Sequence, residues 1–192
     1  MPNWCNSSYA ITGDEKMVKE IYTIMHELES MSEPLVENGF GVTWLGCLVK
    51  RLGEDPSKVY CRGEWRNLSL EQGVLRFDTE SAWSRPNDVF EDLLLRKYGD
   101  IEVYFIEEEL GMDIFQTNDE SGQFFNETVI IDSEEDGMEY YTPEEALDSL
   151  SELLGIELTD WEKAWDVLEK YNQAPEREEE GNRIWVHRVD NV

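Results

Sequence analysis

The sequence predicts an α+β protein with a largely antiparallel sheet. Two observations lead to this class. Strand-like and helix-like stretches are mixed without a strict βαβα alternation, and several neighbouring strands are separated only by short turns, as in hairpins. A strand–helix–strand–strand–helix–strand core up to about residue 118 would have the ferredoxin-like βαββαβ layout.

The first 118 residues supply the elements of this core. Residues 3–13 (NWCNSSYAITG) read as a strand, and Asp14 then caps a helix whose apolar residues recur every three or four positions as far as Met31. The elements expected after it are a short helix over 42–52, strands over 59–69 and 74–83, a helix from Ser84 and Pro86 to Tyr98, and strands over 101–109 and 111–118.

The remaining residues, 119–192, are expected to form an acidic hairpin, two helices and a final strand. The stretches FFNETVIID and MEYYT pair across the turn SEEDG, and RIWVHRV alternates as the last strand. Thr142 and Glu145 form a capping box before the first helix, which Gly155 closes, and Thr159 and Glu162 have the spacing of a second box. Because no long linker or repeat interrupts the chain, we expect 119–192 to pack on 1–118 as one compact domain.

The composition predicts a folded protein with a strongly negative surface. The chain has 192 residues, of which 40% are hydrophobic, and it contains seven Trp, eight Tyr and seven Phe, an aromatic content that disordered chains lack. Forty-four Asp and Glu face 16 Lys and Arg, which gives a formal charge of −28. This charge repels nucleic acids and anionic membranes, so a partner attracted at long range should be a basic protein surface.

The acidic residues are concentrated in one stretch. Residues 107–180 contain 25 acidic and three basic residues, whereas residues 1–106 contain 18 and 11. Carboxylates three or four positions apart on a helix lie about 5–6 Å from each other, close to the spacing of phosphates along a nucleic acid strand. The residues predicted to bind a partner in this way are Glu134, Glu135, Asp136, Glu144, Glu145, Asp148, Glu152, Asp160, Glu162, Asp166 and Glu169.

Known catalytic and metal-binding patterns are weak in this chain. Cys5, Cys47 and Cys61 are widely spaced, and a zinc site formed by them with His187 would lack the usual short ligand pairs. The stretch DSEEDG from Asp132 is faintly similar to a calcium loop, but a hairpin turn explains it better. We therefore expect no enzyme activity, no metal and no cofactor. Without a signal peptide or an apolar run long enough to span a bilayer, we also expect a cytoplasmic location and no membrane contact.

Two stretches resemble a known family. The opening MPNWCNSSYAITG and the segment CRGEWRNLS, followed by LRFDTESAWSRPNDVFEDLLLRKYGDIEVYFIEEELGMDIFQTND, are similar to the YubB-type ferredoxin-like family of phages, plasmids and gut bacteria. The resemblance covers roughly the first 118 residues, and Arg85 stands where that family often has a proline. It implies a ferredoxin-like fold and a mobile-element origin but no activity. Four residues match its motif positions and are expected to form the core and turns, or alternatively a recognition surface: Trp4, Asn6, Trp65 and Trp83.

The sequence leaves three functional hypotheses. The first is an acidic binding protein that inhibits a nucleic-acid-binding enzyme, such as a CRISPR effector, by imitating nucleic acid. The second is an accessory protein-interaction module whose acidity is incidental. The third is an enzyme that depends on a divalent metal. The unpaired acidic residues and the family resemblance favour the first hypothesis.

Overall fold

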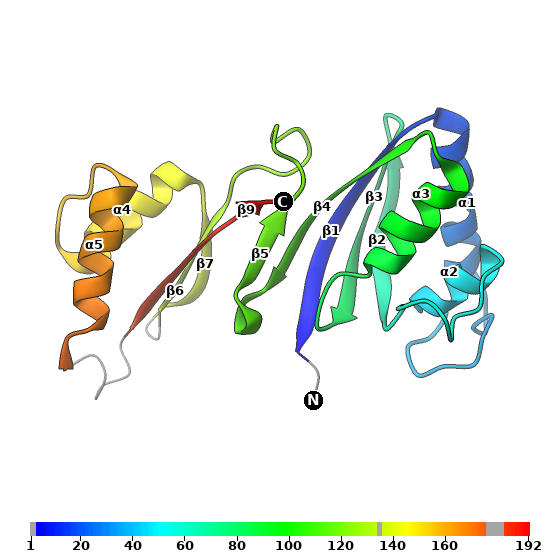
Figure 1. Cartoon of the computed structure of the whole chain (residues 1–192), viewed down its shortest axis with the longest axis horizontal. Coiled ribbons are helices and arrows are strands. Elements are labelled where there is room, and N and C mark those ends of the chain that lie inside the picture. The colour runs from blue at the N-terminus through cyan, green and yellow to red at the C-terminus, as the bar shows by residue number, and fades with distance from the viewer. Residues whose placement is uncertain (1–2, 134–135, 176–182) are drawn as a thin grey trace. The chain divides into compact units, whose positions relative to one another are not determined.

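Two largely antiparallel sheets organise the chain in the computed structural model, which describes residues 3–133, 136–175 and 183–192 (Figure 1). One sheet has six strands in the order β2-β3-β1-β4-β5-β9, and the other has three in the order β7-β6-β8. The chain divides into two units, the first unit with residues 1–125 and 191–192, and the second unit with residues 126–190. The predicted α+β class with mostly antiparallel sheets is confirmed.

The first unit contains most of the secondary structure. Its elements in chain order are β1 (Trp4–Gly13), α1 (Glu15–Glu29), α2 (Leu45–Arg51), β2 (Gly63–Glu71), β3 (Val74–Ala82), the π-helical turn η1 (Asp88–Leu93), α3 (Leu94–Tyr98), β4 (Ile101–Glu109), the 3-10 turn η2 (Leu110–Met112) and β5 (Ile114–Thr117). The last strand, β9 (Asp190–Asn191), returns to the edge of this sheet beside β5.

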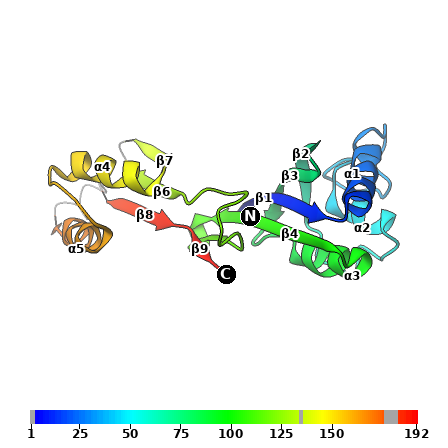
Figure 2. The same ribbon diagram turned by 90° about the horizontal axis from the view of Figure 1, so that it is seen from above.

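The helices of the first unit cover one face of its sheet, as Figures 1 and 2 show. The core beneath them is aromatic: the Tyr9 ring stacks on Phe77 at 5.0 Å between centroids, and Phe90 from η1 lies 4.8 Å from both rings. Helix α1 begins where the sequence predicts, because the Asp14 carboxylate accepts hydrogen bonds from the N–H groups of Lys16 and Met17. Trp65 is buried, and its indole N–H donates to Glu29.

The boundary between the units lies after Phe125 rather than after residue 118. Asn118 prolongs the pairing of β5 with β4, since its side chain accepts from the N–H of Phe105 and donates to the carbonyl of Val103. The segment then folds back on the first unit, where the Phe124 ring lies 4.7 Å from Tyr104. Residues 119–125 thus belong with the first unit. The prediction that the two parts pack together as one domain stays a prediction.

The second unit is a small α+β layer. Its elements are β6 (Val129–Ser133), β7 (Gly137–Tyr141), α4 (Pro143–Leu154), α5 (Trp161–Asn172) and β8 (Ile184–Arg188). Both helices cover the same face of the β7-β6-β8 sheet (Figure 1). Their apolar stripes meet the inward side chains of the strands in a core that includes Val129, Ile131, Ala146, Leu150 and Leu168. This core is separate from the aromatic core of the first unit.

The structure confirms the predicted hairpin and the first capping box of the second unit, but not the second capping box. The hairpin of β6 and β7 forms with Asp132 opposite Met138, and the capping box of Thr142 and Glu145 is present. Helix α5, however, is capped by Asp160 rather than Thr159, because the Asp160 carboxylate accepts the N–H of Lys163. An aspartate is at least as good a cap as a threonine, so the two adjacent candidates compete.

No helix in the described part of the chain combines the length and the apolar composition needed to cross a membrane.

Candidate acidic surface

Helix α4 separates its apolar and acidic residues onto opposite sides. Ala146 and Leu150 are buried in the core of the second unit. Glu144, Asp148 and Glu152, one helical turn apart from each other, are exposed. This spacing brings successive carboxylates within about 5–6 Å along the helix.

Helix α5 repeats this arrangement. Ala164 and Leu168 face the core, while Glu162, Asp166 and Glu169 are exposed at intervals of four and three residues. Lys163 and Lys170 lie on the same helix and reduce its net charge, but Lys163 donates to the carbonyl of Glu157 rather than to a carboxylate. We use the name helix carboxylates for the six exposed residues Glu144, Asp148, Glu152, Glu162, Asp166 and Glu169.

Two of the predicted partner-binding residues also cap helices. Glu145 accepts the N–H and hydroxyl of Thr142, and the N–H contact is the main reason why the pKa of its carboxyl is lowered. Asp160 accepts the N–H of Lys163 and the hydroxyl of Thr159, and these two contacts lower the pKa of its carboxyl. Both carboxylates are therefore at the N-termini of helices, where the macrodipole favours negative charge.

The remaining predicted residues lie in the turn between β6 and β7. Asp136 is exposed, and its N–H donates to the hydroxyl of Ser133. Glu134 and Glu135 fall outside the described residues.

The helix carboxylates have no cationic partner among the described residues. The ion pair found in the described part of the second unit joins Arg188 to Glu127, with 2.7 Å between Nη2 and Oε1. By sequence, residues 126–190 contain 20 acidic and five basic side chains, a net charge of −15. Like charges one turn apart cost a few tenths of a kcal/mol per pair, so these groups oppose folding slightly.

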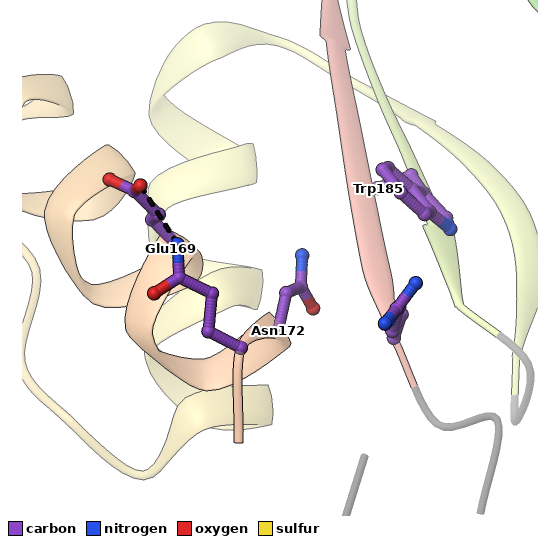
Figure 3. A pocket seen from close by; sticks show the side chains of 5 residues that line it. Glu169, Asn172 and Trp185 are labelled. Atoms are coloured by element: carbon purple, nitrogen blue, oxygen red, sulfur yellow. Dashed lines mark hydrogen bonds between the residues drawn. The ribbon is translucent and has the colours of Figure 1, made fainter. Parts of the chain in front are cut away.

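An open pocket of about 440 Å³ lies beside the C-terminal end of α5 (Figure 3). It is lined by Glu169, Asn172, Gln173, Arg183 and Trp185. The Asn172 side chain bridges α5 to β8, because it donates to the carbonyl of Ile184 and accepts the N–H of the same residue. The Glu169 carboxylate accepts from Gln173 and is the one helix carboxylate that borders this pocket.

Not every acidic residue of the 107–180 stretch reaches the surface. Glu107, Glu109 and Asp119 are all buried in the first unit. Asp119 closes the loop after β5 by accepting the N–H groups of Phe124 and Phe125. The negative electrostatic field of residues 107–180 is therefore weaker than their net charge suggests, and it comes mainly from the second unit.

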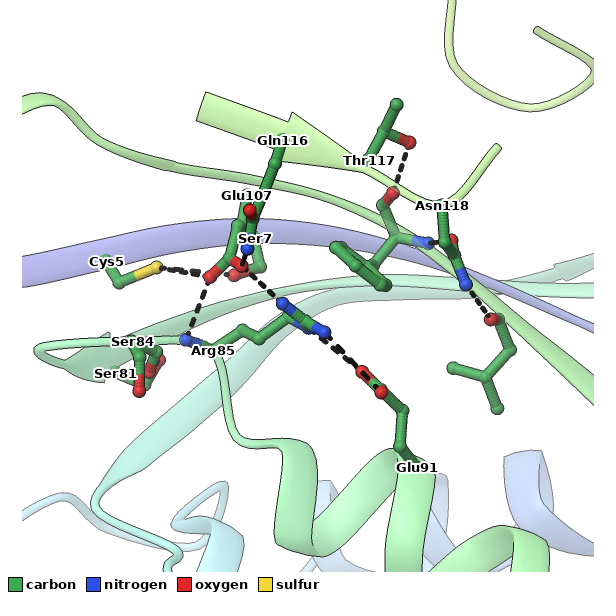
Figure 4. Close-up of polar contacts among 12 residues, drawn as sticks. Cys5, Ser7, Ser81, Ser84, Arg85, Glu91, Glu107, Gln116, Thr117 and Asn118 are labelled. Atoms are coloured by element: carbon green, nitrogen blue, oxygen red, sulfur yellow. Dashed lines mark hydrogen bonds and ion pairs between the residues drawn. The ribbon is translucent and has the colours of Figure 1, made fainter. Parts of the chain in front are cut away.

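Glu107 is the centre of a buried polar cluster in the first unit (Figure 4). Its carboxylate pairs with the Arg85 guanidinium and accepts from the Arg85 N–H, the Gln116 amide and the Cys5 thiol. Arg85 also pairs with Glu91 at 2.9 Å, and its guanidinium lies 3.6 Å from the centroid of the Phe105 ring. Every lone pair that the cluster buries on Glu107 has a donor, which is the condition for keeping a charge in a core.

The cysteines have the properties of buried structural thiols. All three are free and buried. Burial raises the pKa of the Cys5 thiol to about 12 and that of Cys61 to about 11, so both thiols are protonated at neutral pH. Among the residues that the structure describes, no three His, Cys, Asp or Glu side chains are grouped so that they could hold a metal ion.

The four residues singled out by the family resemblance separate into two kinds. Trp65 is a core residue, whereas Trp4 and Trp83 are 41% and 44% exposed, and Asn6 accepts from Arg66 at the surface. Trp83 has a φ of 71°, a strained conformation for a bulky side chain. Comparisons of the chain with family models, with curated proteins and with solved structures give no match. The resemblance to the YubB-type family therefore stays a prediction.

Sequence reasoning missed a group of exposed apolar residues in the second unit. Met138, Tyr140 and Trp185 are each half exposed or more. Because side chains alternate between the two faces of a strand, the stretches MEYY and RIWVHRV could have placed these three residues on one face of a sheet. That assignment requires knowing that both stretches pair with the same strand.

Exchange of Asp160 separates its role as a cap from its role as a charge. Asn keeps the side-chain oxygen that accepts the Lys163 N–H, so Asp160→Asn should leave the melting temperature of the second unit nearly unchanged, whereas Asp160→Ala should lower it. Because the pKa of the folded carboxyl is depressed, its stabilising effect is present above the unfolded pKa of about 3.9 and is lost as the pH falls through the folded pKa. Thermal melts of both variants, followed by NMR amide signals of α5 at neutral and acidic pH, check this. Equal melting temperatures for the two variants would refute the cap.

Removal of Arg85 should destabilise the first unit strongly. Arg85→Met leaves the Glu107 carboxylate buried without its cation, which costs about 3–5 kcal/mol of unfolding free energy. The double variant Arg85→Met/Glu107→Gln should recover part of this loss. The matched control is Arg96→Met, which removes an exposed pair with Glu54 and should cost about 1 kcal/mol or less. Urea denaturation measures all three; similar costs for Arg85→Met and Arg96→Met would contradict the buried ion pair.

Proposed function

We propose that this chain is an acidic binding protein without enzyme activity that occupies the basic groove of a nucleic-acid-binding enzyme and thereby inhibits it. The observation that carries the proposal is the set of six helix carboxylates, exposed on α4 and α5 and without cationic partners among the described residues. Their spacing along each helix is near that of successive phosphates. A groove that binds phosphates with Lys and Arg would gain the same counterion release from them.

The cost of the helix carboxylates supports a binding role over incidental acidity. Solubility needs only a modest net charge, and −15 on 65 residues exceeds it. A few Lys residues among the carboxylates would keep the surface charged and add favourable pairs. The chain instead places three carboxylates one turn apart on α4 with no Lys or Arg on that helix.

The class of enzyme follows from the ancestry that we propose for the first unit. Helices α1 and α2 connect β1 to β2, which are separated in the sheet by β3, and η1 with α3 connects β3 to β4, which are separated by β1. Two interleaved connections of this kind are those of a ferredoxin-like βαββαβ core, which supports that assignment. Together with the resemblance to the YubB-type family, it supports a mobile-element origin. Host nucleases that attack such elements, CRISPR effectors included, are the partners we propose.

A metal-dependent enzyme has less support. The many carboxylates of the described residues do not converge in groups of three or more that could bind a cation. The helix carboxylates instead lie along the outer sides of two helices, an arrangement suited to a surface contact.

Neutralising the helix carboxylates tests the proposal. Glu144→Gln, Asp148→Asn, Glu152→Gln, Glu162→Gln, Asp166→Asn and Glu169→Gln are combined in one variant, which should bind its target about tenfold more weakly or worse, because each exposed pair contributes about 0.2–1 kcal/mol. Binding is measured by pull-down and titration against a panel of DNA-binding enzymes that includes CRISPR effectors, over a salt series and with duplex DNA as competitor.

The matched control neutralises six exposed carboxylates of the first unit: Glu33, Glu37, Glu71, Asp92, Asp100 and Glu120. It changes the net charge equally and should leave binding nearly intact. Binding that is insensitive to salt, that duplex DNA fails to displace, or that both variants weaken equally would argue against mimicry.

A further inference from the structure

The second unit has a second surface, on the side of its sheet that the helices leave open. Val129 and Ile131 of β6 point into the helix-covered core, so the alternate residues Ile130 and Asp132 belong to the opposite face. Their cross-strand partners on β7 and β8 complete this face in two rows that run across the strands. One row is Met138, Asp132 and Trp185, and the other is Tyr140, Ile130 and His187. We call these six residues the open-face patch.

Three of the six residues of the open-face patch are large, apolar and exposed. Met138, Tyr140 and Trp185 have exposed fractions of 50%, 57% and 53%. Ile130 between Tyr140 and His187 is fully buried. Two large aromatic side chains and a methionine on one face of a small sheet form a patch of the kind that marks an interaction site.

The charge of the second unit restricts what can cover this patch. A net charge of −15 on residues 126–190 repels a second copy of the chain, a nucleic acid and an anionic membrane alike. A basic polypeptide is the occupant that this field attracts.

The centre of the first row restricts the occupant further. Asp132 lies directly between Met138 and Trp185, and cross-strand neighbours have their Cβ atoms about 5 Å apart. The row therefore offers one carboxylate flanked by a thioether and an indole. A planar guanidinium is weakly hydrated, stacks on aromatic faces and pairs with a carboxylate in two-point geometry, whereas an ammonium ion is a strongly hydrated point charge.

We propose that the open-face patch docks an arginine-bearing segment of a basic protein, with the guanidinium on the Asp132 carboxylate beside Trp185 and the adjacent residues of the segment on Tyr140 and Met138. The identification of that protein as a nucleic-acid-binding enzyme rests on the proposed function. The docking chemistry rests on the patch itself.

A deca-arginine peptide is the probe, titrated into the full-length ¹⁵N-labelled chain at physiological salt. The amide signals of residues 130–132, 138–140 and 185–187 should shift and saturate, and deca-lysine should bind more weakly. Trp185→Ala and Asp132→Asn should each weaken deca-arginine binding about tenfold, a hot-spot effect. The matched control Trp165→Ala removes an indole of similar exposure from α5 and should have little effect.

Three results would overturn the docking site: shifts confined to α4 and α5, equal affinity of the patch variants and Trp165→Ala, or self-association of the chain through the patch. Trp185→Phe keeps an aromatic ring on the strand and should retain most of the binding, which would show that the loss in Trp185→Ala is not caused by unfolding.

The docking site and the proposed function can fail independently of each other. If the patch variants lose deca-arginine binding but no nucleic-acid-binding enzyme is captured in the pull-down, the docking site is supported and nucleic acid mimicry is not. If only the variant with neutralised helix carboxylates weakens capture of the enzyme, mimicry is supported and the docking site is not.

Discussion

Forty-four carboxylates share this chain with 16 Lys and Arg side chains, and this imbalance constrains both units. A carboxylate can leave water only where donors replace its hydration. The first unit meets this condition at Glu107, which takes four donors and the charge of Arg85 beneath the π-helical turn. At Glu107 the donors include a cation, whereas the buried Asp119 is satisfied by the N–H groups of its own loop and the hydroxyl of Ser121. Each buried acid needs such a set of donors, and the acids without one remain at the surface.

The second unit keeps its helix carboxylates out of its core. Its core is built from aliphatic side chains and alanines between two helices and one face of a three-stranded sheet, and none of its helix carboxylates enters it. With two thin layers and 65 residues, the unit has little apolar area to bury, and exposed carboxylates one turn apart reduce its stability further. A small unit under these conditions would gain stability from covering Met138, Tyr140 and Trp185. Their exposure is therefore a cost that a binding partner can relieve.

Local signals in the sequence predicted much of the fold, whereas contacts between distant segments could not be predicted. Asp14 and the apolar spacing after it fix α1, and the capping box at Thr142 fixes the start of α4, because both signals act within one helical turn. The pairing of β8 with β6 joins residues more than 50 positions apart, and nothing in either stretch specifies it. The open-face patch depends on that pairing and was missed for this reason. The helix carboxylates could be predicted because helical spacing alone defines them, whereas the cap of α5 could not be assigned between the adjacent Thr159 and Asp160.

A surface made only of solvated carboxylates attracts cations without choosing among them. Each exposed contact is weak and screened within about 10 Å, so it raises the rate of encounter more than it discriminates between partners. Discrimination requires groups that lose water on contact, and in the second unit those groups lie on the opposite side of the sheet from the helices. Contacts at Trp185 and Tyr140 would be short-ranged and nearly independent of salt, whereas contacts at α4 and α5 would weaken steeply with it. A partner that binds both the helix carboxylates and the open-face patch must enclose the second unit. For a partner that binds only one of these surfaces, the salt dependence of its affinity shows which surface it binds.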